Sequence, residues 1–262
     1  MRRDKRMVEA KPGKARCTSW NALSPRAKVA WFMMIVIGGW LIRMADPLFG
    51  MLFSIYYISI VRMLYSKADY KEYLGFNKPS RKAIGLAFVA VAVLVAVFLP
   101  FYVLSPLCPM HLFDPILLQI NELLGGNVGL TILVMCLAIC TFTVYAEELF
   151  FRAFIQDAFD TLAGIARGKG RARLEKKRAL TLLWSNLLFG IAHLNLLWDD
   201  IFRWGVTPPD LAFIVIGVLS LSGAGYMFGI LRIESDSIWT AIIAHVVGNI
   251  FQVVLPATIV LS

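Results

Sequence analysis

Long apolar runs are the feature that most constrains this chain. Residues 129–144, which read GLTILVMCLAICTFTV, contain no charged side chain, and several other runs are similarly apolar. A helix needs about 20 predominantly apolar residues to cross the hydrocarbon core of a bilayer. The runs are continuous rather than alternating, which favours helices over the strands of a membrane barrel. The sequence therefore predicts an all-α, polytopic transmembrane helical bundle of about seven to eight helices.

The composition supports a membrane protein and argues against an ordinary soluble domain. Of the 262 residues, 59% are hydrophobic and only 16% are charged, whereas a soluble domain carries about 25% charged residues. The net charge of +9 is therefore interpreted first as a topology signal, because Lys and Arg concentrate in cytoplasmic loops. We expect the bilayer, and no nucleic acid, to be the partner of this positive charge.

The apolar runs place seven membrane spans. We expect them at about 29–45, 47–65, 83–107, 128–147, 179–198, 211–231 and 237–260. The first two could instead form a hairpin that does not fully cross, because Arg43 and Asp46 crowd the turn between them. Residues 1–28 form a basic arm that lacks the apolar core of a signal peptide. Residues 29–262 are expected to form a single membrane domain.

The distribution of basic residues predicts the orientation of the chain. With a cytoplasmic N-terminus, the basic arm and the alternate loops hold 23 of the 26 Lys and Arg residues. This asymmetry follows the positive-inside rule and predicts a multi-pass protein of the cell membrane with its N-terminus inside. Residues 105–127, which contain several prolines and a Gly-Gly pair, are then expected to form a loop on the outer side.

The fourth apolar run continues as a helix beyond the membrane. Its helical pattern extends over 128–165 and is expected to break at Gly168 and Gly170. A helix of that length measures about 57 Å, roughly twice the hydrocarbon core. We therefore expect its end to project into the cytoplasm and to form a hairpin with the fifth helix. The basic tip at 167–178 would anchor the hairpin at the inner surface, or bind anionic lipid or an acidic partner.

Three ionisable residues lie close together in the fourth helix, within YAEELFFRAF at 145–154. Glu148 and Arg152 are four residues apart and share a face of the helix, so they can neutralise each other. Glu147 points about 100° away from Glu148 and cannot share that arginine equally well. It needs a partner from another helix, a shifted pKa or access to water.

Histidines offer the partner that Glu147 needs. The chain has three: His111 lies in the predicted outer loop, where an ordinary loop role is expected, and His193 and His245 lie within apolar helices. If the hairpin turns near residue 170, Glu147 lies 23 residues before the tip and His193 lies 23 residues after it. Two regular antiparallel helices would bring them to the same depth. Glu147 and His193 are thus a candidate acid–base pair.

The last helix carries a second polar pair, in IIAHVVGNI at 242–250. His245 and Asn249 are four residues apart and share a face. Both side chains can donate hydrogen bonds, which would suit the stabilisation of an oxyanion in a water-poor site. The alternative is an interhelical hydrogen bond that only holds the bundle together.

These residues fall into three motifs that together resemble a known family. EELFFR at 147–152 has the form EExxxR, FGIAH at 189–193 has the form FxxxH, and HVVGN at 245–249 has the form HxxxN. In this order, on three membrane helices, they resemble the CPBP family of intramembrane proteases. The family includes the type II CAAX prenyl endopeptidases and the bacteriocin-processing or self-immunity (Abi) proteins. The resemblance covers about residues 80–255.

The resemblance implies peptide-bond hydrolysis within the membrane. Carried over by position, Glu147 with His193 would activate a water molecule. His245 and Asn249 would stabilise the oxyanion of the tetrahedral intermediate. The residues that would support the shape of the site are Glu148, Arg152 and Phe189.

A metal is not required by the sequence. The family is often labelled as metalloproteases, yet the chain contains no HExxH motif, the usual helical zinc signature. Glu147, His193 and His245 could still bind zinc as three protein ligands. Cys136 and Cys140 lie on the face of Glu147 and could add a soft ligand, or they serve as small residues that allow close helix packing.

Three functions compete at this stage. The first is an endopeptidase acting on membrane-bound peptides or proteins, either a prenylated CAAX protein or, in a bacterium, a leader peptide. The second is a non-catalytic immunity or scaffold protein that binds a bacteriocin, a lipid or a membrane partner. The third is a transporter with an intramembrane ion site, which the lack of inverted repeats and interrupted half-helices disfavours.

Overall fold

The computed structural model describes residues 50–64, 75–104, 114–165, 176–193 and 208–261, and a few single positions between 24 and 38. These residues form helices and short connections and contain no strand, which confirms the all-α class. The elements are α3 (Gly50–Leu64), α5 (Arg81–Leu104), α6 (Asp114–Leu123), α7 (Val128–Met135), η3 (Cys136–Thr143), α8 (Val144–Glu147), η4 (Glu148–Ile155), α9 (Gln156–Leu162), α10 (Lys176–Ala192), α12 (Pro208–Ser235) and α13 (Ile238–Val260). Because α7 to α9 run on without a break, the described residues hold seven helices, in agreement with the predicted number.

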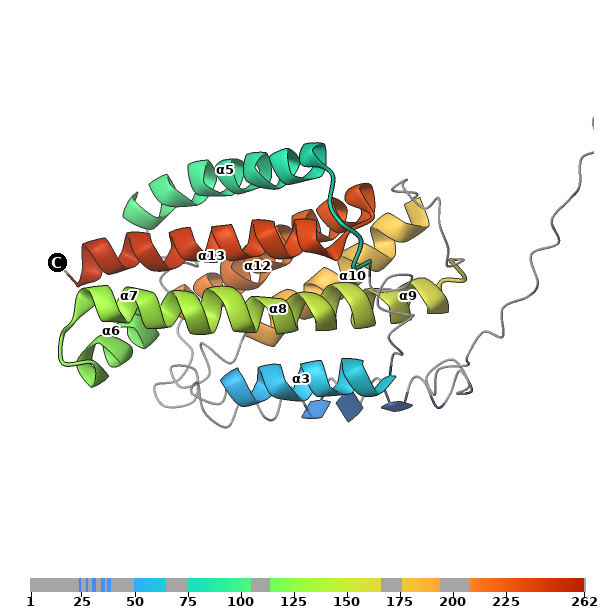
Figure 1. The fold of residues 1–262 in the computed structure, drawn as a ribbon, viewed down its shortest axis with the longest axis horizontal. Coiled ribbons are helices and arrows are strands. Elements are labelled where there is room, and N and C mark those ends of the chain that lie inside the picture. Colours follow the sequence, from blue (N-terminus) through green and yellow to red (C-terminus); the bar gives the residue numbers. More distant parts are fainter. Residues whose placement is uncertain are drawn as a thin grey trace, which may run out of the picture.

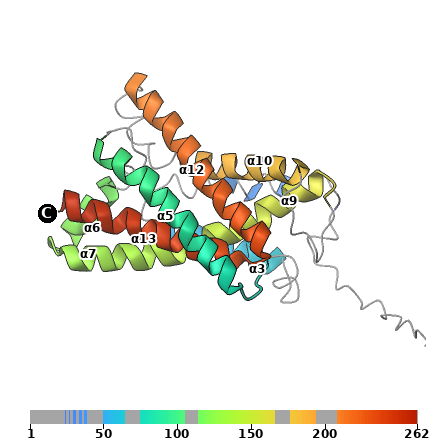
Figure 2. The ribbon, with the colours of Figure 1, turned by 90° about the horizontal axis from the view of Figure 1, so that it is seen from above.

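The helices lie side by side in one bundle around the continuous helix from α7 to α9 (Figure 1). α13 packs between this helix and α5, and α3 packs along its other side (Figure 1). α12 crosses the bundle obliquely, and α10 packs against α12 (Figure 2). The long helix therefore contacts α3, α10 and α13, which makes its middle the natural place for a buried site.

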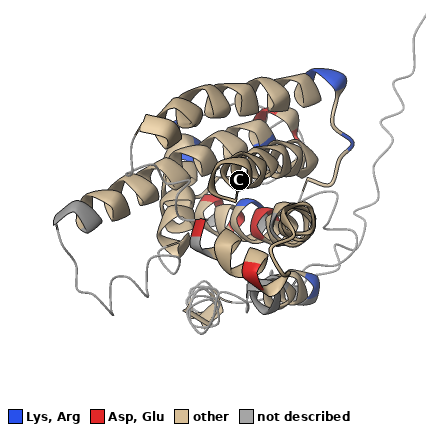
Figure 3. Ribbon diagram, turned by 90° about the vertical axis from the view of Figure 1, so that its left-hand side faces the viewer, with Lys and Arg blue, Asp and Glu red and all other residues tan. Residues whose placement is uncertain are grey.

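Four of the described helices are long and apolar enough to cross a membrane, judged by length and composition alone. They are Arg81–Leu104, Val128–Asp160, Leu211–Ser235 and Ile238–Val260, and their ribbons carry few charged residues (Figure 3). They correspond to four of the seven predicted spans, which supports a multi-pass membrane protein.

The other three predicted spans are not tested to the same extent. α3 and α10 are shorter, with 15 and 17 residues, and the predicted span at 29–45 lies mostly outside the described residues. The basic arm at 1–28 also lies outside them, apart from two positions, and so does most of the basic tip at 167–178. The total number of spans and the orientation of the chain therefore stay predictions.

The connection between α5 and α7 differs from its prediction. The sequence predicts a loop over 105–127, but residues Asp114–Leu123 form α6. Pro115 occupies the first turn of this helix, where a missing backbone N–H costs nothing. Leu117 is buried against Met135 at the end of α7. A proline-rich composition thus concealed a short helix that packs onto the bundle.

The long helix ends earlier than predicted. α9 stops at Leu162, and Gly164 adopts a left-handed conformation with φ +70°. The N–H of Ile165 donates to the carbonyl of Asp160 at 2.9 Å, which closes the helix in the way typical of a C-terminal glycine. The predicted break at Gly168 and Gly170 is therefore wrong by one turn, because Gly164 already supplies the required φ.

Two stretches of the long helix are π-helical, η3 and η4. In η3 the hydroxyls of Thr141 and Thr143 donate to the carbonyls five residues earlier, at 3.2 and 3.1 Å. π-helical turns are rare and often lie at functional sites. The wider turns of η4 rotate the side chains that follow Glu147 relative to a regular α-helix.

α10 and α12 approach each other closely because glycines line their interface. A Cβ on Gly190 would collide with Ser222 and the carbonyl of Val218, and one on Gly229 would collide with Leu182. Small residues allow such close contact between membrane helices. Gly229 also belongs to a GxxxG pattern that starts at Gly225. This packing fixes the position of α10, which carries part of the candidate site.

Candidate active site

The two adjacent glutamates lie where the long helix changes from α to π geometry. Glu147 is the last residue of α8 and Glu148 is the first residue of η4. Both are buried, with exposed fractions of 3% and 0%. A buried carboxylate is costly unless it is paired or hydrogen-bonded. The two glutamates meet this requirement in different ways.

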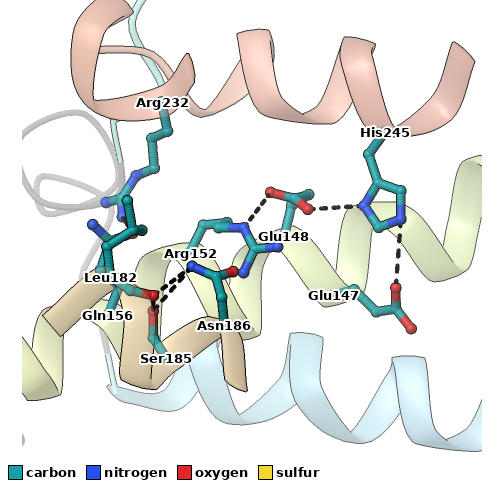
Figure 4. A network of polar contacts seen from close by, with 9 residues as sticks. All are labelled: Glu147, Glu148, Arg152, Gln156, Leu182, Ser185, Asn186, Arg232 and His245. Atoms are coloured by element: carbon teal, nitrogen blue, oxygen red, sulfur yellow. Dashed lines mark hydrogen bonds and ion pairs between the residues drawn. The ribbon is translucent and has the colours of Figure 1, made fainter. Parts of the chain in front are cut away.

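Glu148 forms a closed ion-pair network. Its Oε2 lies 3.4 Å from Nε of Arg152, and both side chains are completely buried. This confirms the predicted pairing of the two residues on one helix face. Its other oxygen, Oε1, lies 2.8 Å from Nδ1 of His245 on α13 (Figure 4). The sequence did not predict this second contact, which ties the last helix to the long one.

Glu147 lies between two histidines from different helices. Its Oε1 is 3.7 Å from Nε2 of His193, which directly follows α10. Its Oε2 is 3.9 Å from Nε2 of His245 (Figure 4 shows this second contact). The structure thus brings Glu147 and His193 together, as the hairpin spacing predicts. Both distances exceed the length of a direct hydrogen bond.

The second ring nitrogen of each histidine has a partner that fixes the ring. Nδ1 of His193 lies 2.7 Å from the carbonyl oxygen of Phe189. A carbonyl only accepts, so Nδ1 of His193 carries the proton. Nδ1 of His245 likewise faces the carboxylate of Glu148. Both rings therefore direct Nε2 toward Glu147, and the partner of Nδ1 sets this orientation.

Aromatic side chains enclose the network. The ring of Phe189 lies 4.6 Å from that of His193 and 6.0 Å from that of His245, edge-on to both. The guanidinium carbon of Arg152 lies over the same ring, 4.8 Å from its centre, in the range of a cation–π contact. Phe228 on α12 stacks on His245 at 4.7 Å. These rings surround both histidines and limit their rotation.

Asn249, the remaining predicted site residue, lies one turn after His245 on α13 and is half-buried. The helix is regular there, so the two residues share a face as predicted. Within the described part of the chain, its side chain makes no hydrogen bond to the other site residues. His111, by contrast, lies outside the described residues.

Sequence reasoning missed three residues around the site: Asn186, Gly225 and Phe228. None is ionisable, so none stands out in an apolar helix. The GxxxG pattern GYMFG at 225–229 was the one signal that could have pointed to this part of α12. Asn186 and Gly225 meet beside Arg152, and their arrangement is described below.

A metal ion would need ligands in a suitable arrangement around Glu147. Zinc sites use three or four His, Cys, Asp or Glu ligands at about 2.0–2.3 Å from the metal. Among the described residues, no group of three or more such side chains is arranged to hold a metal ion, and this includes Glu147 with its two histidines. Cys140 is instead buried in an apolar cluster with Met135 and Val253. No step below therefore involves a metal.

Comparison with known proteins identifies the segment that carries the site. Residues 129–251 match the family model described as type II CAAX prenyl endopeptidase Rce1-like. The match contains all three motifs and every residue of the network. Searches of curated proteins and of solved structures found no match for the chain. Residues 129–251 therefore match an Rce1-like domain, in agreement with the family resemblance that the three motifs predict.

Proposed function

We propose that this protein is an intramembrane endopeptidase in which Glu147 and His193 activate a water molecule. One observation carries the proposal: a buried carboxylate faces Nε2 of two oriented histidines, inside a domain of a protease family. Here the gap of 3.7 Å between Glu147 and His193 is one that a bridging water can span.

The first chemical step follows from the donors and acceptors at this gap. In the neutral form with its proton on Nδ1, His193 presents an unprotonated Nε2. A water molecule can therefore donate one hydrogen to Nε2 of His193 and the other to Glu147. Glu147 takes the proton as the water oxygen attacks the carbonyl carbon of the peptide. Glu147 then returns this proton to the amide nitrogen, and the C–N bond breaks.

His245 can supply a donor to the oxyanion. Two carboxylates and one arginine leave one negative charge in the network, which a protonated His245 would neutralise. In that state Nδ1 donates to Glu148 and Nε2 is a second donor. Asn249, one turn away, can add its amide N–H. Such fixed donors stabilise charge well in a site that excludes water.

The substrate is expected to be a membrane-bound peptide or protein, because the site is buried among helices that can cross a bilayer. The family description makes a prenylated CAAX protein one candidate, and a leader peptide is the other. We propose a cytoplasmic N-terminus, supported by the 23 of 26 basic residues that this orientation places on the inner side. The hairpin formed by α9 and α10 would then lie on that side.

The deciding experiment compares the peptides that accumulate in cells expressing the wild type and Glu147→Gln. This change keeps the size of the side chain and removes the base. We expect substrates to persist in full length in Glu147→Gln membranes and to appear as defined fragments with the wild type. The control is Glu122→Gln, the same substitution at an exposed residue of α6, which should leave the fragments unchanged.

A reporter assay gives the same answer for the purified protein. An internally quenched farnesylated peptide that ends in a CAAX sequence would be incubated with each variant in detergent. Equal fragment patterns and equal turnover for wild type and Glu147→Gln would overturn the proposal. They would favour the alternative, a non-catalytic immunity or scaffold protein, for which the buried network is purely structural.

A further inference from the structure

Three side chains of the site converge on the backbone of Gly225 in α12. A Cβ at this position would lie 2.7 Å from Oδ1 of Asn186, 2.8 Å from Nη2 of Arg152 and 2.9 Å from Cδ1 of Phe189. All three side chains are buried. Any residue larger than glycine would therefore displace at least one of them. The missing side chain creates the space in which an amide and a guanidinium meet.

The amide of Asn186 is held with its oxygen free. Its Nδ2 donates to the carbonyl of Leu182 at 2.6 Å and lies 3.5 Å from Oγ of Ser185. Because a backbone carbonyl accepts only, the nitrogen must lie on that side and the oxygen on the other. Oδ1 then lies on the side of Arg152 (Figure 4).

The two groups complement each other chemically. Within the described part of the chain, neither Oδ1 of Asn186 nor the two Nη atoms of Arg152 have a hydrogen-bond partner. Arginine offers only donors, and an amide oxygen only accepts. Buried polar groups of this kind are nearly always paired, because an unpaired one costs about 1–3 kcal/mol. Both groups lie beside the same point, because the position of a Cβ on Gly225 is 2.7 Å from Oδ1 of Asn186 and 2.8 Å from Nη2 of Arg152.

We infer that Asn186 is a positioning residue whose Oδ1 accepts a hydrogen bond from Arg152, in a space that Gly225 keeps open. Arg152 binds Glu148 at 3.4 Å, and Glu148 binds His245 at 2.8 Å. Asn186 thus orients, through two intermediates, the histidine that faces Glu147. This inference rests on the proposed function only where it predicts an effect on catalysis.

Arg152 would then be fixed from three directions. Glu148 binds Nε, the ring of Phe189 lies under the guanidinium plane, and Asn186 holds the outer edge. Without the last contact the planar group can turn on the ring and carry Glu148 with it. Misplacing a catalytic group by about 1 Å can cost about 100-fold in rate. The effect is expected in kcat rather than in KM, because Asn186 is buried and acts through Arg152 and Glu148.

The first test compares two changes of similar size, Asn186→Leu and Asn186→Asp, with the farnesylated CAAX reporter. Leucine removes the acceptor, and aspartate keeps an oxygen beside Arg152 but loses the donor to Leu182. We expect Asn186→Leu to lower kcat about 10-fold or more at unchanged KM, and Asn186→Asp to retain more activity. The reverse order would overturn the inference, since a packing role favours the apolar residue over a buried charge.

The second test uses a pair of glycines on α12. Gly225→Ala inserts a Cβ where Asn186 and Arg152 meet, and we expect a similar loss in kcat. Gly223→Ala is the matched control: a Cβ there meets nothing within 4 Å. It should leave kcat unchanged. Equal kcat for Gly225→Ala and the wild type would contradict the inference.

A third test needs no substrate and separates this inference from the proposed function. Melting temperatures in detergent are measured for Asn186→Leu in the wild type and in an Arg152→Met background. If the two side chains bind each other, Asn186→Leu lowers the melting temperature only while Arg152 is present. An equal drop in both backgrounds would overturn the contact, whatever Glu147→Gln does to cleavage. If Arg152→Met does not fold, the same comparison is made between Gly225→Ala and Gly223→Ala.

Discussion

Two buried polar clusters lie along the same helix, and they are built differently. The first is the network of Glu147, Glu148, Arg152 and the two histidines. The second lies at the α9 end, where Asp160 binds Thr181 through a 2.5 Å hydrogen bond and Arg178 at 3.7 Å. There the carboxylate is shared between two partners on one neighbouring helix, α10. The cluster connects the end of the long helix to α10.

The network in the middle of the helix combines three helices and leaves a gap at its centre. Glu148 accepts a hydrogen bond from His245 at 2.8 Å and lies 3.4 Å from Arg152, whereas the two histidines lie 3.7 and 3.9 Å from Glu147. Two adjacent glutamates thus have different surroundings: Glu148 lies beside an arginine and one histidine, and Glu147 lies between two histidines. The α9 cluster is therefore interpreted as structural, and the network in the middle of the helix as the proposed active site.

The largest loss of activity is expected when a histidine that faces Glu147 is removed. His193→Ala should lower kcat/KM by about 100- to 10,000-fold, the usual contribution of a general acid or base. Added imidazole should restore part of the activity, because it can enter the space that the ring leaves. Turnover at the wild-type level, measured with the CAAX reporter on a folded sample, would exclude His193 from the mechanism.

Substitution of Asn249 tests its proposed role as a hydrogen-bond donor to the oxyanion. Asn249→Ala should lower kcat by about 100- to 1,000-fold, as the loss of one oxyanion donor does elsewhere. Its side chain is half-buried and, among the described residues, makes no hydrogen bond to the network, so the melting temperature should change little. A large fall in stability without a kinetic defect would instead assign Asn249 to helix packing.

Arg152 tests how strongly the buried ion pair with Glu148 stabilises the fold. Arg152→Met leaves Glu148 buried beside His245 without its main counter-charge. Breaking a buried ion pair by removing one partner costs about 3–5 kcal/mol, so the melting temperature should fall strongly. The double change Arg152→Met with Glu148→Gln should be more stable than Arg152→Met alone. If it is less stable, the pair is not self-compensating.

Sequence patterns predicted which residues lie near one another in the candidate site better than they predicted the individual contacts between these residues. The spacing around the hairpin predicted that Glu147 and His193 lie close together, because depth along antiparallel helices follows from counting residues. The contact between Glu148 and His245 was missed, because counting does not give the rotation of one helix against another. The π-helical turns of η4 change that rotation further.

The elements that were predicted wrongly or missed have local physical causes. Prolines around α6 suggested a loop, yet Pro115 lies in the first turn, where a helix tolerates it. Gly164 ended the long helix before the expected glycines. Asn186 and Gly225 act through shape and hydrogen-bond geometry, which a single sequence does not display. The roles of such residues can be recognised only from the packing of the helices.

The α9 cluster should respond to mutation in stability alone. Asp160→Asn keeps the size of the side chain but removes the charge that Arg178 and Thr181 share. We expect a loss of about 1–3 kcal/mol, the value of hydrogen bonds to a charged group. For the folded fraction, kcat on the CAAX reporter should stay at the wild-type level. A kinetic defect as large as that of His193→Ala would show that the two clusters are coupled.

The smallest expected effect concerns metal removal, and it tests whether the gap around Glu147 holds a water or an ion. Dialysis against a strong zinc chelator should leave kcat unchanged, since the described residues contain no set of three ligands arranged for a metal. Metal analysis of the purified protein is the accompanying measurement. Stoichiometric zinc, with activity lost on chelation and regained on adding zinc, would contradict this. Glu147, His193 and His245 would then be the zinc ligands.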